Sequence, residues 1–415
     1  MSPQLDDRPA VNPDLSEGAT SADEPVVPRS SSNEARRRQR RRAFSGTGIA
    51  VTGLIAGAFL LASGAGSPPP RPAKATGAQP AGTSGFRWQR VVTSSSPSVR
   101  IGAPTAYDPG TRQLVLIGGV RQVQPTTGLP AMTTTILGDT WVFAHNDWSQ
   151  RTSGSTPPIG TSADALAYDP ARKALVLVTA PGYAKGTTRI TQPSTTWMWT
   201  GSRWREKFGS GPGWGTTGAL MTYDPATHQL VFAPDGRRGT SVPSTYVLGT
   251  SEWLRGPNPP RLSRMAYDPV TRRLVGEDGA NGSMWWWTGK RWHLVMHHVV
   301  VRLRAGSFYG VLVQSANWVT DQSADELVVL GLFDPSTPTP VHPTHQPDLF
   351  TWLRDRWRPI DAPMHPAPTN MQLLSLAYDE SVGGVVAFGG GGGEQIGPRT
   401  WISGGNSTWE LVRSR

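Results

Sequence analysis

A short turn that recurs along the chain constrains the fold more than any other feature. Its first copy runs from Tyr107 to Leu116, with Asp108 and Pro109 at the turn itself and an apolar run behind them. Asp followed by Pro favours a type I turn, because proline presets φ and the aspartate oxygen can accept a backbone N–H two residues on. The further copies begin at Tyr168, Tyr223 and Tyr267, a looser copy without the proline begins at Tyr378, and a degenerate copy begins at Thr320.

The spacing of these copies indicates a repeat protein. The turn aspartates recur at intervals of roughly 54 residues, close to the roughly 50 residues of a kelch-type propeller blade. The Leu-Val run that follows most of the turns predicts a short buried strand. The sequence therefore predicts six copies of one supersecondary unit.

A second and independent signal lies in each interval. Aromatic residues occur in pairs seven or eight positions apart, with turn residues such as Gly201 and Gly289 between some of the pairs. This pattern predicts a second hairpin, so that each unit supplies about four strands. The pairs are Trp141 and Trp148, Trp197 and Trp204, Tyr246 and Trp253, Trp285 and Trp292, Phe350 and Trp357, and Trp401 and Trp409.

The Tyr-Asp turn, the Leu-Val strand, the Gly-Gly steps and the aromatic hairpin together resemble the kelch and galactose-oxidase-like β-propeller family over residues 86–415. The resemblance implies an all-β ring of four-stranded blades. Six blades are expected and seven remain open, because Phe86–Val91 matches the last strand of an aromatic hairpin while the C-terminal unit already has one. The sequence thus leaves the strand that closes the ring undecided.

The first 85 residues have a different composition. Residues 1–35 are rich in Pro, Ser, Asp and Glu, which predicts a disordered arm. Residues 36–42 hold six arginines, and residues 43–66 form an uncharged run that is long enough for a membrane-spanning helix. Residues 67–85, rich in Pro, Ala and Gly, predict a linker. Because positive residues stay in the cytoplasm, the propeller is expected outside a single-pass anchor in the cell membrane, with the arm in the cytoplasm.

An export signal is the alternative for residues 43–66. The strongly apolar centre from Ile49 to Ala62 has the length of a signal-peptide core, and Ala73-Lys74-Ala75 could serve as a cleavage site. The long forward segment and the lack of a strong cleavage site directly after the apolar run favour an uncleaved anchor. A secreted propeller, released after cleavage, is the second interpretation.

Composition excludes several kinds of chemistry. The chain has no cysteine, so disulfides and thiolate metal sites are excluded, and the chain departs from the galactose-oxidase-like enzymes at the residue that their cross-linked tyrosine cofactor requires. The clusters at His293, His297 and His298 and at His342 and His345 lie in predicted strands and loops, where their spacing does not converge on a metal. No metal and no cofactor is therefore expected. The net charge of +10 is scattered without a basic stripe, so nucleic acid is not an expected partner.

Two classes of function remain. The repeated aspartates are explained by turn formation, and no nucleophile motif is present, so no catalytic residue is assigned. The first hypothesis is a non-catalytic binding or scaffold module that recognises a protein, peptide or glycan at the rim of the central channel. Its candidate rim residues precede the Tyr-Asp turns of different blades: Arg100, Trp214, Arg261 and Asn370. The alternative is a carbohydrate-active or sugar-isomerising enzyme, which requires two carboxylates, or a His with a carboxylate, at one channel mouth.

Overall fold

A computed structural model gives the fold of most residues from Phe86 onward. The predicted arm, arginine flank, membrane helix and linker lie outside the described residues. The described ranges are 86–125, 133–152, 156–159, 164–180, 182–183, 190–208, 210–212, 219–234, 244–278, 282–297, 301–302, 308–309, 317–322, 325–331, 348–352, 357–360, 374–389, 394–397, 400–403 and 405–413.

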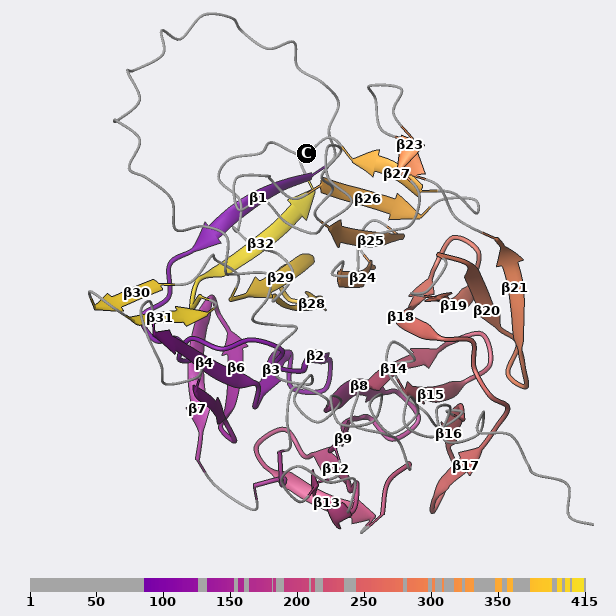
Figure 1. The fold of residues 1–415 in the computed structure, drawn as a ribbon, viewed down its shortest axis with the longest axis horizontal. Coiled ribbons are helices and arrows are strands. Elements are labelled where there is room, and N and C mark those ends of the chain that lie inside the picture. Colours follow the sequence, from indigo (N-terminus) through magenta and orange to yellow (C-terminus); the bar gives the residue numbers. More distant parts are fainter. Residues whose placement is uncertain are drawn as a thin grey trace, which may run out of the picture. The chain divides into compact units, whose positions relative to one another are not determined.

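Six antiparallel sheets of four strands surround a common axis (Figure 1), which confirms the prediction of a six-bladed β-propeller. Blades 1 to 3 consist of β2 (Thr105–Asp108), β3 (Gln113–Ile117), β6 (Thr140–Ala144) and β7 (Asp147–Arg151); β8 (Ala165–Asp169), β9 (Ala174–Val178), β12 (Thr196–Trp199) and β13 (Trp204–Phe208); and β14 (Ala219–Asp224), β15 (Gln229–Pro234), β16 (Tyr246–Leu248) and β17 (Trp253–Arg255). Blades 4 to 6 consist of β18 (Leu262–Asp268), β19 (Arg273–Asp278), β20 (Met284–Trp287) and β21 (Trp292–Met296); β24 (Asn317–Asp321), β25 (Glu326–Gly331), β26 (Asp348–Trp352) and β27 (Trp357–Ile360); and β28 (Ser375–Asp379), β29 (Gly384–Phe388), β32 (Thr408–Arg413) and β1 (Phe86–Val91).

The ring is closed by the first described strand. The first strand of each blade lies nearest the axis, and β28 of blade 6 contacts β2 of blade 1. Strand β1 pairs antiparallel with β32, with Phe86 opposite Arg413, and so forms the outer strand of blade 6. The closing strand that the sequence left undecided is therefore the N-terminal one, and the described strands form no seventh blade.

The aromatic pair predicted for the last unit is wrong. Trp401 lies in β31 (Thr400–Ser403), which pairs with β30 (Glu394–Gly397) and β4 (Val120–Pro125) and makes no ladder with β32. The hairpin partner of β32, which contains Trp409, comes from the start of the ring: Trp88 of β1 lies opposite Leu411, as Trp148 lies opposite Phe143 in blade 1. A spacing rule within one chain segment could not find this pair, because its two strands come from opposite ends of the ring.

The Tyr-Asp turns form as predicted. In five blades the aspartate Oδ1 accepts the backbone N–H two residues on, as from Gly110 to Asp108 at 3.1 Å. A threonine one position further donates its hydroxyl to Oδ2 in three of these turns, for example from Thr227 to Asp224 at 2.6 Å. All six turn aspartates are buried. Each of these five turns is therefore fixed by its own carboxylate.

Neighbouring blades pack through apolar faces and one repeated hydrogen bond. The cluster around Leu116, Trp148 and Phe388 joins blades 1 and 6, and similar clusters join the other neighbours. The outer-strand tryptophan of a blade donates its indole N–H to the first threonine of the third strand in the preceding blade. Four such pairs join Trp148 to Thr408, Trp204 to Thr140, Trp253 to Thr196 and Trp292 to Thr245, which directly precedes its strand, at 2.8 to 2.9 Å.

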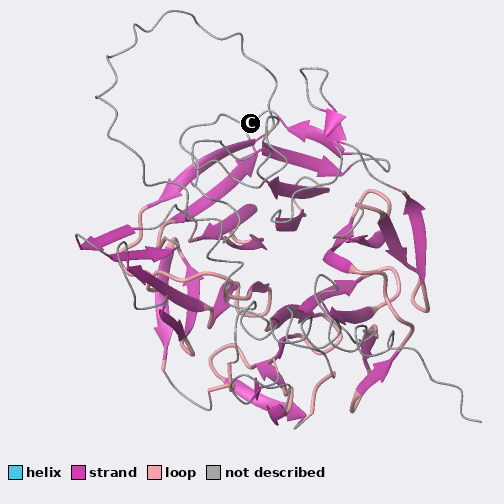
Figure 2. Ribbon diagram, in the orientation of Figure 1, coloured by secondary structure: helices cyan, strands magenta, loops and turns pink. Residues whose placement is uncertain are grey.

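The antiparallel order gives the ring two different faces. We call the end that holds the Tyr-Asp turns, and the turns between the third and outer strands, the turn face. The opposite end, which we call the insertion face, holds the connections between the second and third strands and between blades. Small extra sheets belong to it (Figure 2): β4 and β5 (Thr133–Ile136) pair with β30 and β31 across blades 1 and 6, β10 (Gly182–Tyr183) pairs with β11 (Ile190–Gln192), and β22 (Val301–Arg302) pairs with β23 (Phe308–Tyr309).

Within these described ranges, no helix is both long enough and apolar enough to cross a bilayer. The predicted membrane helix of residues 43–66 falls outside them and stays a prediction.

Candidate functional site

The inner strands of all six blades line one hollow of about 250 Å³ at the insertion face. We call it the axial pocket. Each blade contributes residues from the start of its inner strand. Most of these residues have apolar side chains, but polar atoms make up the larger part of the surface that faces the hollow. One position recurs in every blade, two residues before the turn tyrosine or, in blade 5, before Thr320. The residues at this position are Thr105, Leu166, Met221, Met265, Trp318 and Leu376.

The polar side chains of the axial pocket are few and are held by the backbone. Ser375 donates its hydroxyl to the carbonyl of Ala103 at 2.8 Å. The buried carboxylate of Asp164 accepts the backbone N–H of Ala180 at 2.7 Å. Asp164 is the one titratable residue among the described residues of the lining. Apolar side chains together with a small number of oriented polar groups are typical of a binding pocket.

Blade 4 differs from the other blades beside this pocket. Arg264 forms an ion pair with Glu277, and both side chains are almost fully buried. The position of Glu277 in the second strand is occupied by Ile117 in blade 1 and by Phe388 in blade 6. A buried ion pair contributes less to stability than apolar packing of the same volume, because both charges lose their hydration. Packing alone therefore does not explain why blade 4 has charges here.

Arg100, a predicted rim residue, has a structural role. Its side chain is fully buried, and its guanidinium contacts both carboxylate oxygens of Asp139, at 2.7 and 2.8 Å. It also donates to the carbonyl of Gly118 and to both oxygens of Ser98. Burial by itself would raise the pKa of Asp139, but hydrogen bonds from Arg100 and Trp141 outweigh it and hold the pKa below its usual value. Arg100 thus ties the segment before β2 to the start of β6.

The other predicted rim residues are not brought together by the described part of the ring. Arg261 is exposed in the connection before β18 and does not line the axial pocket. Trp214 and Asn370 lie outside the described residues, so a binding role for them stays a prediction. The rim residues were sought six to nine residues before the turn tyrosines, whereas the axial pocket is lined by residues two to four positions before them. Aligning the six copies on their tyrosines would have found these positions.

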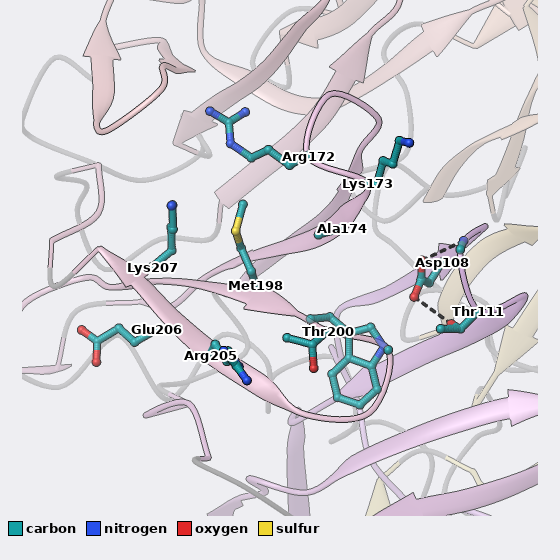
Figure 3. Close-up of a pocket in the computed structure, with 13 residues that line it drawn as sticks. Asp108, Thr111, Arg172, Lys173, Ala174, Met198, Thr200, Arg205, Glu206 and Lys207 are labelled. Carbon is teal, nitrogen blue, oxygen red and sulfur yellow. Dashed lines mark hydrogen bonds between the residues drawn. The ribbon is translucent and has the colours of Figure 1, made fainter.

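The turn face has a larger hollow of about 530 Å³ between the turns of blades 1 and 2. Figure 3 shows the turn with Asp108 and Thr111 on one side of it and Lys207 and Glu206 on the other. Its cationic lining residues are Arg172, Lys173, Arg205 and Lys207. Arg172 is paired with Asp169 at 2.5 Å, which leaves an excess of positive charge in this hollow.

The tyrosines of the turns lie close to the carboxylate of the preceding blade. Burial raises the pKa of Tyr168, and the charges of Asp108 and Asp169 raise it further. Tyr223 has the same relation to Asp169. Burial also raises the pKa of Asp224, despite the hydrogen bonds that it accepts. These shifts repeat around the ring, so they reflect the repeat and do not mark one catalytic blade.

Of the histidines in the two predicted clusters, His293 is described and takes part in packing. His293 stacks on Trp286 with ring centroids 5.5 Å apart and accepts a hydrogen bond from Arg291 at 2.8 Å. His297 is exposed, and His298, His342 and His345 lie outside the described residues. No group of three metal-ligating side chains converges within the part of the chain that the structure describes.

Comparison with known proteins does not assign the chain to a family. No family profile and no curated protein matches the chain. Among solved structures, a gluconolactonase from Xanthomonas campestris is similar at 11% identity and a TM-score of 0.44, covering 79% of this chain and 90% of its own. An auxiliary nutrient binding protein from Bacteroides ovatus gives 10% identity and a TM-score of 0.44, covering 80% and 78%. A protein described as a glucose dehydrogenase from Thermus thermophilus is similar at 15% identity and a TM-score of 0.42, covering 79% of this chain and 100% of its own. These similarities are too distant to indicate a function.

Proposed function

We propose that the propeller is a non-catalytic binding module that holds a protein or peptide partner at the axial pocket. The observation that supports this is the ring of side chains at one repeated position of the six blades, of which all but Thr105 are apolar. A hollow of about 250 Å³ is smaller than the roughly 300 to 1,000 Å³ typical of pockets for whole small ligands. It suits one apolar side chain that projects from a larger partner, which is how a central anchor residue works in many interfaces.

The module acts outside the membrane in this proposal. Residues 43–66 anchor it to the bilayer, and residues 1–42 stay in the cytoplasm because of their arginines. Protease added to intact cells should degrade the propeller and leave the N-terminal arm intact. A propeller recovered from the culture medium without residues 43–66 would instead support secretion after cleavage.

Selection of peptides on the purified full chain tests the binding site. A random peptide display library should enrich sequences that share one large apolar residue. Met221→Lys, which places a charge in the axial pocket, should weaken these peptides at least tenfold. Thr134→Lys makes the same charge change on exposed strand β5 and should leave binding unchanged.

Leu166→Ala provides a second pocket variant in case Met221→Lys fails to fold. Equal peptide binding by wild type and by folded pocket variants would overturn the proposal. Enrichment on a glycan array, with the same sensitivity to Met221→Lys, would assign the pocket to a sugar and not to a peptide.

One observation favours the alternative of a carbohydrate-active enzyme, namely the buried charges of Arg264, Glu277 and Asp278 beside the pocket. Perturbed buried charges also occur at catalytic sites. Turnover of a carbohydrate panel that is lost in Glu277→Gln, with an unchanged melting temperature, would establish this alternative.

A further inference from the structure

The turn face carries an arc of positive charge over blades 1 to 4. Six exposed basic side chains lie in its turns: Arg112, Lys173, Arg203, Arg272, Lys290 and Arg291. None of these six side chains forms an ion pair with a described carboxylate. The turn aspartates beneath them are buried and bonded to their own turns. The solvent-facing charge of this arc is therefore positive.

The acidic side chains of the turn face lie elsewhere. Exposed Asp325 and Glu380 belong to the corresponding turns of blades 5 and 6. Among the turns of blades 1 to 4, Glu252 is the exposed acid of the described residues, and exposed Glu206 lines the hollow of this face, while Asp147 is bonded to Ser94 and Ser95. The insertion face also exposes Arg121, Arg255 and Arg261 in its described part, whereas Arg100 and Arg264 there are paired with Asp139 and Glu277.

Three of the basic residues occupy a backbone conformation that L-residues rarely adopt. Arg112, Lys173 and Arg272 have φ of 55°, 52° and 55°. The equivalent residue of blade 6 is Gly383, at φ 64°. Glycine adopts this conformation without steric cost, whereas other residues lose stability there. Long cationic side chains at these positions are therefore not explained by turn formation.

The chain also reaches the ring from this side. Phe86 begins β1 opposite Arg413 at the end of β32, and the third strand of every blade ends at the turn face. The segment that precedes Phe86 therefore leaves the propeller at the turn face. If residues 43–66 span the membrane, as proposed above, the face that holds the connection to the membrane is also the basic one.

We propose that the turn face docks on the surface of an anionic bilayer through this arc, so that the axial pocket of the insertion face points away from the membrane. Clusters of Lys and Arg beside a membrane anchor are attracted to anionic lipid headgroups, and salt screens this attraction. The occupant is the lipid surface itself. The proposal rests on the anchor of the proposed function but not on the ligand of the axial pocket.

Two labelled variants of the full chain test the docking. The chain has no cysteine, so Ser202→Cys and Ser210→Cys each give a single labelling site. Ser202 lies in the turn before β13 and Ser210 follows β13, and both are exposed. Strand β13 rises about 3.3 Å per residue, which separates the two sites along the ring axis. Energy transfer from a fluorophore at each site to an acceptor lipid reports which face is nearer the bilayer.

In vesicles with about 30% phosphatidylglycerol, transfer from position 202 should be at least twofold greater than from position 210. The difference should vanish in purely zwitterionic vesicles and at about 0.5 M salt, where the screening length is only a few ångströms. Lys173→Glu with Lys290→Glu should also abolish it. Arg121→Glu with Arg255→Glu makes the same charge change on the insertion face and should preserve it.

Equal transfer from both sites, or a difference that persists in zwitterionic vesicles, would overturn the docking. Failure of the chain to associate with anionic vesicles would overturn it as well. Retention of the full chain through an alkaline carbonate wash tests the anchor separately. Competition by soluble polyphosphate with no lipid dependence would assign the arc to a free polyanion and refute the membrane surface.

Discussion

The two faces of the propeller are made by the same six sheets, but they are held together in different ways. On the turn face, the six Tyr-Asp connections have equal length, and the aspartate of the turn provides the cap in at least five of them. On the insertion face, the connections between second and third strands range from residues 279–283 in blade 4 to residues 118–139 in blade 1. The turn face therefore has its repeat fixed locally, and the insertion face does not.

The difference assigns structure and specificity to opposite ends of the ring. Function on a rigid scaffold usually lies where connections vary, and the axial pocket opens at the insertion face. The contacts that hold this face are particular to one blade, such as the Arg100 and Asp139 pair and the sheet that joins β4 to β31. We expect substitutions there to have individual effects, and substitutions on the turn face to have similar effects from blade to blade.

The largest loss of stability is expected for Arg100→Ala on the insertion face. The change leaves the carboxylate of Asp139 without its bidentate partner and the carbonyl of Gly118 without a donor. Breaking a buried ion pair in this way should lower the free energy of unfolding by about 3 kcal/mol. Denaturant titration of the full chain measures this. Arg100→Lys keeps the charge but not the bidentate geometry, so its free energy of unfolding should lie between those of the wild type and Arg100→Ala.

An unchanged unfolding midpoint in Arg100→Ala would contradict this assignment. Combined with lost peptide binding, it would restore Arg100 as a rim residue that contacts the partner.

The next effect is expected for Asp224→Ala on the turn face. Asp224 accepts hydrogen bonds from the backbone N–H of Ala226 and from the hydroxyl of Thr227. Because both donors lose their acceptor, stability should fall by about 2 kcal/mol. Thr134→Ala, at an exposed position of β5, should change stability by less than about 0.5 kcal/mol. The equivalent change Asp268→Ala should match Asp224→Ala if the turns are interchangeable.

The turn face was predictable from sequence because its determinants are local. Asp108 and Gly110 are two residues apart, so the turn, its cap and the two strands beside it can be read from one short segment. The repeat then gave the number of blades. The threonine that completes the cap, such as Thr111, lies in the same segment and was missed only because the carboxylate was assigned a single acceptor role.

The insertion face was less predictable because its contacts join distant segments. Trp88 belongs beside Leu411, and β4 pairs with β31 from the other end of the chain. Arg100 was predicted as a rim residue because an arginine before a turn is expected to be exposed. It is buried because it pairs with Asp139, and the sequence does not show that these two residues are neighbours. The axial pocket was missed for a different reason, since its positions are local but were sought too far upstream of the turns.

Asp139 on the insertion face and Asp224 on the turn face should change the pH dependence of stability in opposite directions. Asp139 has a lowered pKa, so its contribution is present above the unfolded value of about 3.9 and is lost as the pH falls through its folded pKa. Asp224 has a raised pKa, so the folded state takes up a proton first, and its contribution to stability grows as the pH falls through that value. Asp139→Asn should therefore flatten the loss of stability in acid, and Asp224→Asn should steepen it.

Unfolding midpoints between pH 7 and pH 3.5 measure both slopes. Slopes that change in the same direction in the two variants would contradict the opposite environments of these carboxylates.

The smallest change in stability is expected for substitutions at the last position of the Tyr-Asp turns. Basic residues hold this position in three blades, so the result also tests why the turn face is basic. His228 has φ of 55°, and its Nδ1 lies 3.4 Å from the hydroxyl of Tyr223, too far for a strong hydrogen bond. His228→Gly relieves the backbone cost but increases the entropy of the unfolded chain, so a net gain of about 0.5 kcal/mol is expected. Gly383→Ala, where the added Cβ would meet no atom within 4 Å, should lose a similar amount. Calorimetric melting of both variants checks this, and a loss of stability in His228→Gly would show that the side chain itself supports the turn. A gain would mean that the side chain at this turn position is retained although it lowers backbone stability. Lys173 and Arg272, which hold the same position in the neighbouring blades, would then require a role at the surface.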